Sequence, residues 1–94
     1  MTTPDYKILH DAEAGRFAIK VDGHQGYVEY DQENGVMAIN HTIVPPAIGG
    51  RGIAGALVQA ALDHARATGL KVAPHCSYAD TWIRKHPEYE DLRC

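Results

Sequence analysis

Residues 49–55, which read Gly-Gly-Arg-Gly-Ile-Ala-Gly, have the composition of an anion-binding segment. They lie where an expected strand gives way to an expected helix, and the first turn of a helix carries unpaired backbone N–H groups and a partial positive charge. An Asp, Ser or Thr cap and a nearby acid usually compensate for these groups, but the first acidic residue here is Asp63. Glycines leave such a backbone accessible. The segment therefore favours a bound phosphate over the alternative, a glycine-rich loop hydrated by water.

The same glycines spell G-x-G-x-x-G, the phosphate-binding signature of dinucleotide-binding folds. That signature requires a parallel strand–helix–strand unit and an acid about twenty residues further on, which holds the ribose. The next expected strand ends in Ala73, Pro74 and His75, without an acid, and the strands before the glycines are expected to be antiparallel. A P-loop is excluded because no Gly-Lys-Ser/Thr follows. The sequence thus points to another kind of phosphate ligand.

Cys76 is the candidate nucleophile of the chain. We expect Ser77 and Asp80 to form a capping box that opens a short helix, which would place Cys76 just outside the helix N-terminus, where the dipole favours a thiolate. His75 is adjacent in the sequence, and His41 could face the thiol across the sheet. The alternative for Cys76 is a small buried apolar residue at the end of a strand.

Short strands are expected to fill the first half of the chain, because apolar and polar residues alternate between tight turns. The Asp22-Gly23 and Asn34-Gly35 turns are typical of hairpins, and Pro45 ends the fourth expected strand. The expected strands cover residues 6–10, 16–21, 26–31 and 36–44. Consecutive strands with short connections predict an antiparallel meander.

The second half changes to a helical period. Apolar residues between Ile53 and Ala65 form the stripe of an amphipathic helix that Gly69 closes, and a strand over 70–73 and a helix over 77–85 follow. His86-Pro87 breaks the second helix, and the tail is expected to be a turn or short helix. The prediction is a single α+β domain over residues 1–94: an antiparallel β-meander of about four strands followed by helix–strand–helix.

Composition excludes several classes of function. Nine Lys and Arg against twelve Asp and Glu give a net charge of -3, so the chain lacks the strong positive charge that binds the phosphate backbone of a nucleic acid. No apolar run is long enough to span a membrane, and the N-terminal residues lack the pattern of a signal peptide. Two cysteines are too few for a disulfide framework, so we expect a cytoplasmic protein with reduced thiols. His75, Cys76 and His86 match no zinc spacing, and no metal is expected.

The strand, prolines, glycine turn and helix together resemble the acyl-coenzyme A pyrophosphate site of the GNAT superfamily of N-acetyltransferases, and above all its minimal members. The resemblance covers residues 15–92 and rests on four elements in order: His41-Thr42-Ile43-Val44, the glycine turn, Ala61-Leu62-Asp63, and Pro74-His75-Cys76-Ser77-Tyr78 followed by His86-Pro87-Glu88-Tyr89. The family's first Arg or Gln position is Gly49 here, which leaves Arg51 as the one cationic side chain near the pyrophosphate.

The resemblance implies a truncated GNAT-like fold with acetyl-coenzyme A as the cofactor. Backbone N–H groups of the glycine turn would hold the pyrophosphate. Pro45 would splay the fourth strand from the strand after the helix, so that the end of the fourth strand could pair with the pantetheine arm. An N–H near Ile43 or Val44 would polarise the thioester carbonyl. The cofactor-binding residues implied are Thr42, Ile43, Val44, Gly49, Gly50, Arg51, Gly52, Ile53 and Ala54.

The catalytic residues implied are Cys76, His41 and Tyr78. Cys76 could accept the acetyl group and pass it to an amine, or the amine could attack directly with His41 or a water chain as base. Tyr78 could protonate the departing thiolate. The structural alternatives are a hydrogen-bonded sheet histidine for His41 and a core pair with Trp82 for Tyr78.

The amine acceptor is expected to be a protein lysine. Longer members of the superfamily carry extra elements that shape the acceptor pocket, and their absence from this chain leaves an open, mildly acidic face that suits a protein better than a small metabolite. Two other functions remain open at this point: a module that binds coenzyme A without turnover, and a structural interaction domain that does not bind coenzyme A.

Overall fold

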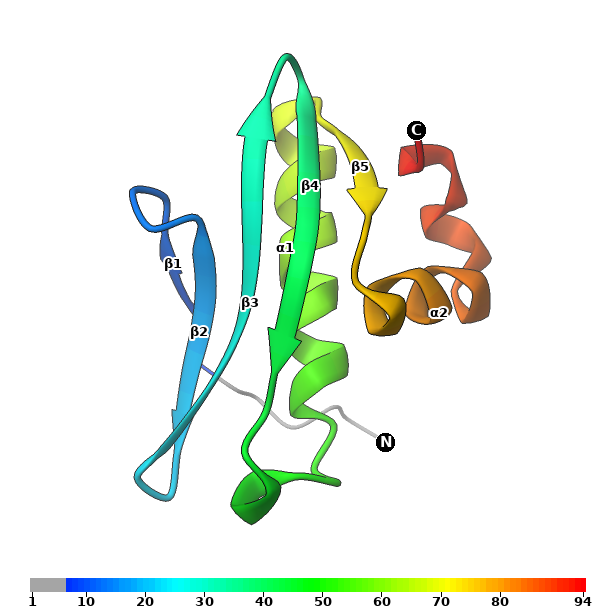
Figure 1. The fold of residues 1–94 in the computed structure, drawn as a ribbon. Coiled ribbons are helices and arrows are strands. Elements are labelled where there is room, and N and C mark those ends of the chain that lie inside the picture. The colour runs from blue at the N-terminus through cyan, green and yellow to red at the C-terminus, as the bar shows by residue number, and fades with distance from the viewer. Residues whose placement is uncertain (1–6) are drawn as a thin grey trace.

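The computed structural model describes residues 7–94, which form a single five-stranded sheet in the order β1-β2-β3-β4-β5 with two helices (Figure 1). The expected α+β class is confirmed. The elements are β1 (Leu9–Asp11), β2 (Arg16–Val21), β3 (His24–Glu33), β4 (Val36–Ile43), α1 (Ile53–Thr68), β5 (Lys71–Pro74) and α2 (Ser77–Lys85), with short 3₁₀ turns at Pro46–Ile48 and Pro87–Leu92.

Strands β1 to β4 form the expected antiparallel meander. Both hairpin turns have positive φ at their two central residues, Asp22-Gly23 and Asn34-Gly35, and such turns match the twist of the flanking strands. Pairing therefore continues up to each turn, and β3 is longer than the predicted 26–31. The first expected strand begins at Leu9 in the described residues, and its residue 6 lies outside them.

Strand β5 joins the edge of β4 in parallel, with α1 as the connection between the two strands. The chain therefore does contain a parallel strand–helix–strand unit, and this argument against a dinucleotide fold does not hold. The other argument stands, because β5 ends in Ala73-Pro74 and is followed by His75, without an acid to bind a ribose.

The core lies between α1 and one face of the sheet (Figure 1). Alternate strand residues such as Phe17, Val28 and Ile39 are buried there against the apolar stripe of α1. That stripe is the predicted one, with Ile53, Leu57, Val58, Ala61, Leu62 and Ala65 buried. The residues between the buried ones, among them Arg16, Glu29 and Ala38, point to the opposite face of the sheet, which we call the open face.

The start of α2 differs from the predicted capping box. Cys76 is itself the N-cap, Ser77 is the first helical residue, and no side chain caps the helix. The carboxylate of Asp80 accepts a hydrogen bond from Arg93 at 2.6 Å and pairs with Arg84 at 3.4 Å. A charged guanidinium is a stronger donor to a carboxylate than the backbone N–H of Ser77, which the capping box would have used.

The C-terminal residues pack along the outer edge of β5. Arg93 forms an isolated parallel bridge with Val72, and the backbone N–H of Cys94 donates to the carbonyl of Val72 at 3.1 Å. The 3₁₀ turn at Pro87–Leu92 leads into this contact and buries Tyr89 and Leu92. The tail is therefore a short helical turn, as expected, that closes one edge of the sheet.

Candidate active site

The glycine turn takes a conformation that only glycine adopts easily. Gly50 and Gly52 both have a φ of 75°, in the left-handed region, and Gly52 is the N-cap of α1. A Cβ atom on either residue would meet nothing within 4 Å, so the backbone conformation and not crowding requires glycine. Gly49, by contrast, has a φ of -69° and donates its N–H to the carbonyl of Pro46.

The first turn of α1 leaves backbone donors available. The first helical hydrogen bond runs from the N–H of Ala56 to the carbonyl of Gly52. Within residues 7–94 no acceptor is bonded to the N–H groups of Gly50, Gly52, Ile53 and Ala54, no side chain caps the helix, and its first turn holds no acid. An anion placed here would meet converging donors and the positive end of the helix dipole.

Arg51 reaches away from the turn toward the β2–β3 hairpin. Its guanidinium lies 2.6 Å from the carboxylate of Asp22 in an exposed ion pair. The guanidinium of Arg51, which was predicted to face the pyrophosphate, is therefore already paired with a carboxylate. The backbone, not Arg51 alone, must carry most of the attraction for an anion.

A cavity of about 280 Å³ opens beside these donors. Its lining joins the end of β4, the glycine turn and α2 through Val44, Gly50, Gly52, Ala54 and Tyr78. The lining includes one predicted catalytic residue, Tyr78, and six of the predicted cofactor-binding residues: Val44, Gly49, Gly50, Gly52, Ile53 and Ala54. This geometry can accommodate a phosphate-bearing ligand whose arm runs toward β4.

Strands β4 and β5 part above this cavity. Their last paired residues are Ile39 and Pro74, yet β4 continues to Ile43. A register shift in the β3–β4 pairing inserts Asn40 as an extra residue at the same level. The separation predicted from Pro45 therefore begins earlier, at this bulge and at Pro74. It leaves the edge of β4 at Thr42 and Ile43 unpaired by β5, and we call the point of separation the fork.

Cys76 lies at the fork. Its backbone N–H donates to the carbonyl of Ile39, and its half-buried thiol lies 3.4 Å from the hydroxyl of Thr42. As the N-cap of α2, it stands at the positive end of a helix, as expected although by a different cap. The structure thus brings together Cys76 and Thr42, residues 34 positions apart in the sequence.

Tyr78 projects from the first turn of α2 toward the start of α1. It is 41% exposed, whereas Trp82 stacks on His86, so the two do not form the core pair that their spacing suggested. Burial, and after it the charge of a Cys76 thiolate, raise the pKa of Tyr78. Tyr78 is therefore a protonated donor beside the cavity at neutral pH.

His41 does not face Cys76. Directly paired residues share a face of a sheet, and His41 pairs with Glu29, whereas Thr42 pairs with the buried Val28. The imidazole therefore lies on the open face, opposite to the hydroxyl that contacts the thiol. The expectation that His41 adjoins Cys76 is wrong, because the bulge at Asn40 sets the facing of the last β4 residues.

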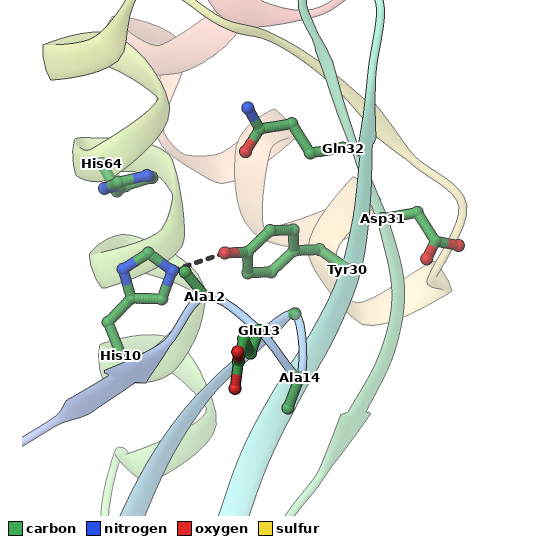
Figure 2. Close-up of a pocket in the computed structure, with 9 residues that line it drawn as sticks. His10, Ala12, Glu13, Ala14, Tyr30, Asp31, Gln32 and His64 are labelled. Carbon is green, nitrogen blue, oxygen red and sulfur yellow. Dashed lines mark hydrogen bonds between the residues drawn. The ribbon is translucent and has the colours of Figure 1, made fainter.

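A second cavity, of about 320 Å³, lies farther along α1 (Figure 2). His10 bonds Tyr30 there and stacks on Phe17, with the ring of His64 at 4.5 Å. Burial, and after it the charge of His64, lower the pKa of His10. Because His64 follows Ile53 by eleven residues, this cavity lies about 16 Å along the helix from the glycine turn and belongs to no part of the candidate site.

Two further features concern the placement of metal-ligating side chains and the character of the helices. Over residues 7–94, no three His, Cys, Asp or Glu side chains come together as a metal site. The ring of His86 is engaged with Trp82, whose carbonyl it bonds at 2.7 Å. Neither of the described helices has the length and apolar character needed to cross a bilayer.

The family model for the GCN5-related N-acetyl-transferase matches residues 16–92. The chain belongs to this family. It is 33% identical over 85 residues to protein NATD1 of Mus musculus, covering 86% of this chain and 76% of the mouse protein, and 31% identical over 84 residues to NATD1 of Xenopus tropicalis, covering 86% and 77%. The solution structure of a GCN5-like protein from Staphylococcus aureus superposes with a TM-score of 0.75 at 27% identity, covering 97% of this chain and 90% of that one.

In this member of the family, three residues that sequence reasoning missed shape the candidate site: Gly55, Asp22 and Asn40. Gly55 lets α2 approach α1, because a Cβ there would lie 3.2 Å from the indole nitrogen of Trp82 and 3.5 Å from the Tyr78 hydroxyl. The last glycine of the G-x-G-x-x-G pattern signalled this close packing. Asp22 and the bulged Asn40 gave no local signal, since both act through residues distant in the sequence.

Proposed function

We propose that the protein transfers an acetyl group from acetyl-coenzyme A to the amine of a protein lysine. The observation that carries this proposal is the set of open N–H groups at Gly50, Gly52, Ile53 and Ala54 beside a cavity that Val44 and Tyr78 also line. Cys76, at the fork, precedes Tyr78 by two residues. The donor set fits a pyrophosphate, which would supply the anion that the uncapped helix start lacks. When bound, the cofactor would supply a thioester.

The unpaired edge of β4 fits the remaining part of the ligand. Residues Thr42 and Ile43 pair with β3 on one side only, so an extended amide-bearing arm can lie along them as an added strand. A backbone N–H near Ile43 or Val44 would then donate to the thioester carbonyl as negative charge develops on its oxygen. This assigns Thr42, Ile43 and Val44 to the arm, as the sequence predicted.

Cys76 acts as the nucleophile in the route we favour. Its thiolate would attack the acetyl carbonyl, and the thiolate of coenzyme A would leave with a proton from Tyr78. The acceptor amine would then attack the acetyl-cysteine, release the Cys76 thiolate and give up the proton that restores Tyr78. Its place at the N-terminus of α2 and the hydroxyl of Thr42 at 3.4 Å support this role. Tyr78, protonated beside the cavity, donates a proton to the departing thiolate. A cytoplasmic, reducing setting would keep the thiol free.

Direct attack by the amine is the competing route. His41 lies on the open face, so it would serve as base only for an amine that arrives from that side, and it would not activate Cys76. In this route the hydroxyl of Tyr78 keeps the same role. The two routes differ in whether an acetyl group is ever attached to the protein.

Calorimetry and intact-protein mass spectrometry test the proposal together. We expect acetyl-coenzyme A to bind, and rapid quenching without an acceptor to show a mass gain of one acetyl group that Cys76→Ser abolishes. Cys94→Ala is the matched control, because Cys94 is the other free cysteine and is exposed. Absence of cofactor binding at millimolar concentration would overturn the proposal; binding without acetylation of any amine would indicate a coenzyme A-binding module.

A further inference from the structure

The open face carries a groove that the proposed chemistry does not use. A cavity of about 360 Å³ lies between β3, β4 and β5, on the face away from α1. Ala38 and Ala73, paired across β4 and β5, form its floor, and the side chains of Asp31 and Glu33 line one side. The small floor residues make the groove, because their larger neighbours Met37, Ile39 and Val72 point into the core.

The groove ends at the fork. Ile39 and Pro74 are the last paired residues of β4 and β5, and the residues that follow them, Asn40 and His75, both line the groove. Cys76 comes next in the chain. The groove therefore ends beside Cys76, two residues before the Tyr78 that lines the cavity at the glycine turn.

The acidic residues that line the groove are Asp31 and Glu33. Asp31 accepts a hydrogen bond from the side-chain amide of Asn40 at 2.9 Å, and Glu33 is exposed. Within the described residues no cation lies within 4 Å of either carboxylate, whereas Glu29, next on this face of β3, pairs with Arg16 at 2.6 Å. Exposed carboxylates beside a groove attract a cationic ligand, and the attraction weakens with salt.

The dimensions of the groove fit a chain segment better than a lone amine. It runs from Val36 to Asn40 along β4, four residue steps or about 13 Å of extended strand. Beyond it, the open face carries an apolar row across four strands, because Leu9 pairs with Ala18, Ala18 with Tyr27 and Tyr27 with Ile43. Leu9 is 62% exposed and Ile43 44%, so this row offers a second contact to a macromolecule.

We propose that the groove binds a basic, lysine-bearing segment of the acceptor protein and directs one lysine side chain to the fork. Asp31 and Glu33 hold cationic side chains that flank the reactive lysine, and the apolar row contacts the body of the acceptor. This inference rests on the proposed acetyl transfer at Cys76 and specifies the acceptor for it. Asp31 and Glu33 are positioning residues, since they contact the cationic side chains that flank the reactive lysine and take no part in the transfer of the acetyl group.

Steady-state kinetics with two synthetic peptides test the groove. Both contain one lysine, flanked by arginines in one peptide and by glutamates in the other. We expect a lower KM for the basic peptide, and Glu33→Gln and Asp31→Asn should each raise it by about threefold at low salt without changing kcat or acetyl-coenzyme A affinity. Glu88→Gln, which removes an equal charge from the exposed 3₁₀ turn at Pro87–Leu92, is the matched control and should change nothing.

A second measurement needs no turnover. In NMR titrations of the full chain with the basic peptide, the amide signals of residues 31, 33, 38 and 73 should shift, and less so in Glu33→Gln. Equal KM values for the two peptides, or equal effects of Glu33→Gln and Glu88→Gln, would overturn the proposal that the groove binds the acceptor and would leave the proposed acetyl transfer unaffected. A small polyamine that binds with the same dependence on Asp31 and Glu33 would also overturn the peptide assignment. Failure of acetyl-coenzyme A to bind would count against the proposed function alone.

Discussion

Two glycines of α1 allow a controlled test of the anion site. Gly52 and Gly69 cap the two ends of the helix, with φ of 75° and 76°, and a Cβ on either would meet nothing within 4 Å. Replacing each by alanine therefore imposes the same left-handed strain, about 1–2 kcal/mol, partly offset by the lower entropy of the unfolded chain. We expect Gly52→Ala and Gly69→Ala to lose about 1 kcal/mol of unfolding free energy each in urea denaturation.

Their effects on the cofactor should differ. The Cβ of Gly52→Ala stands at the open N–H groups beside the cavity, whereas Gly69 lies at the far end of the helix. Loss of one hydrogen bond to a charged group costs about 1.5–3 kcal/mol, so the dissociation constant of acetyl-coenzyme A should rise by about tenfold to a hundredfold in Gly52→Ala only. Calorimetry measures it. Equal affinities in both variants would refute the view that this helix end binds the pyrophosphate.

Three further outcomes are expected. Asp22→Asn keeps a residue that tolerates positive φ but removes the carboxylate that holds Arg51, so acetyl-coenzyme A should bind more tightly in calorimetry; weaker binding would mean that the ion pair orders the turn. Tyr78→Phe should lower kcat by about a hundredfold with unchanged cofactor affinity, and an unchanged rate would remove Tyr78 as the acid. The pKa of His10 is lower in the folded chain than in the unfolded chain, so the unfolded chain takes up a proton at this residue at higher pH, and the free energy of unfolding should fall as pH drops below 6.5. An NMR titration that gives His10 a pKa at or above 6.5 would contradict this. Replacing the neighbouring histidine in His64→Asn should raise the pKa of His10.

Local patterns predicted the elements and the glycine turn, because the determinants are themselves local. The alternation over Arg16–Val21 matches β2 at both ends, and the hairpin glycines are in the positive-φ positions that they favour. The uncapped start of α1 could likewise be predicted from the sequence, since the residues that cap a helix lie within one turn of its end.

The errors arose where distant residues decide the outcome. The facing of His41 follows from the bulge at Asn40, which depends on how β4 aligns with Glu29 and Tyr30 of β3. Asp80 bonds Arg93 because the C-terminal segment returns beside β5, and Arg51 meets Asp22 because a hairpin lies beside the turn. None of these pairings leaves a trace in the spacing of neighbouring residues.

The return of the C-terminal segment to β5 has a consequence for self-association. The edge of a sheet is a template for a strand of another molecule, and the bond from Cys94 to Val72 occupies part of that template on the β5 side. At the other border, β1 is three residues long and ends in the charged Asp11, which makes it a poor nucleus for fibril growth. Among residues 7–94, one face of the sheet has no helix packed on it and β4 is unpaired by β5 at one end, yet the two edges of the sheet offer little template for a strand of another molecule.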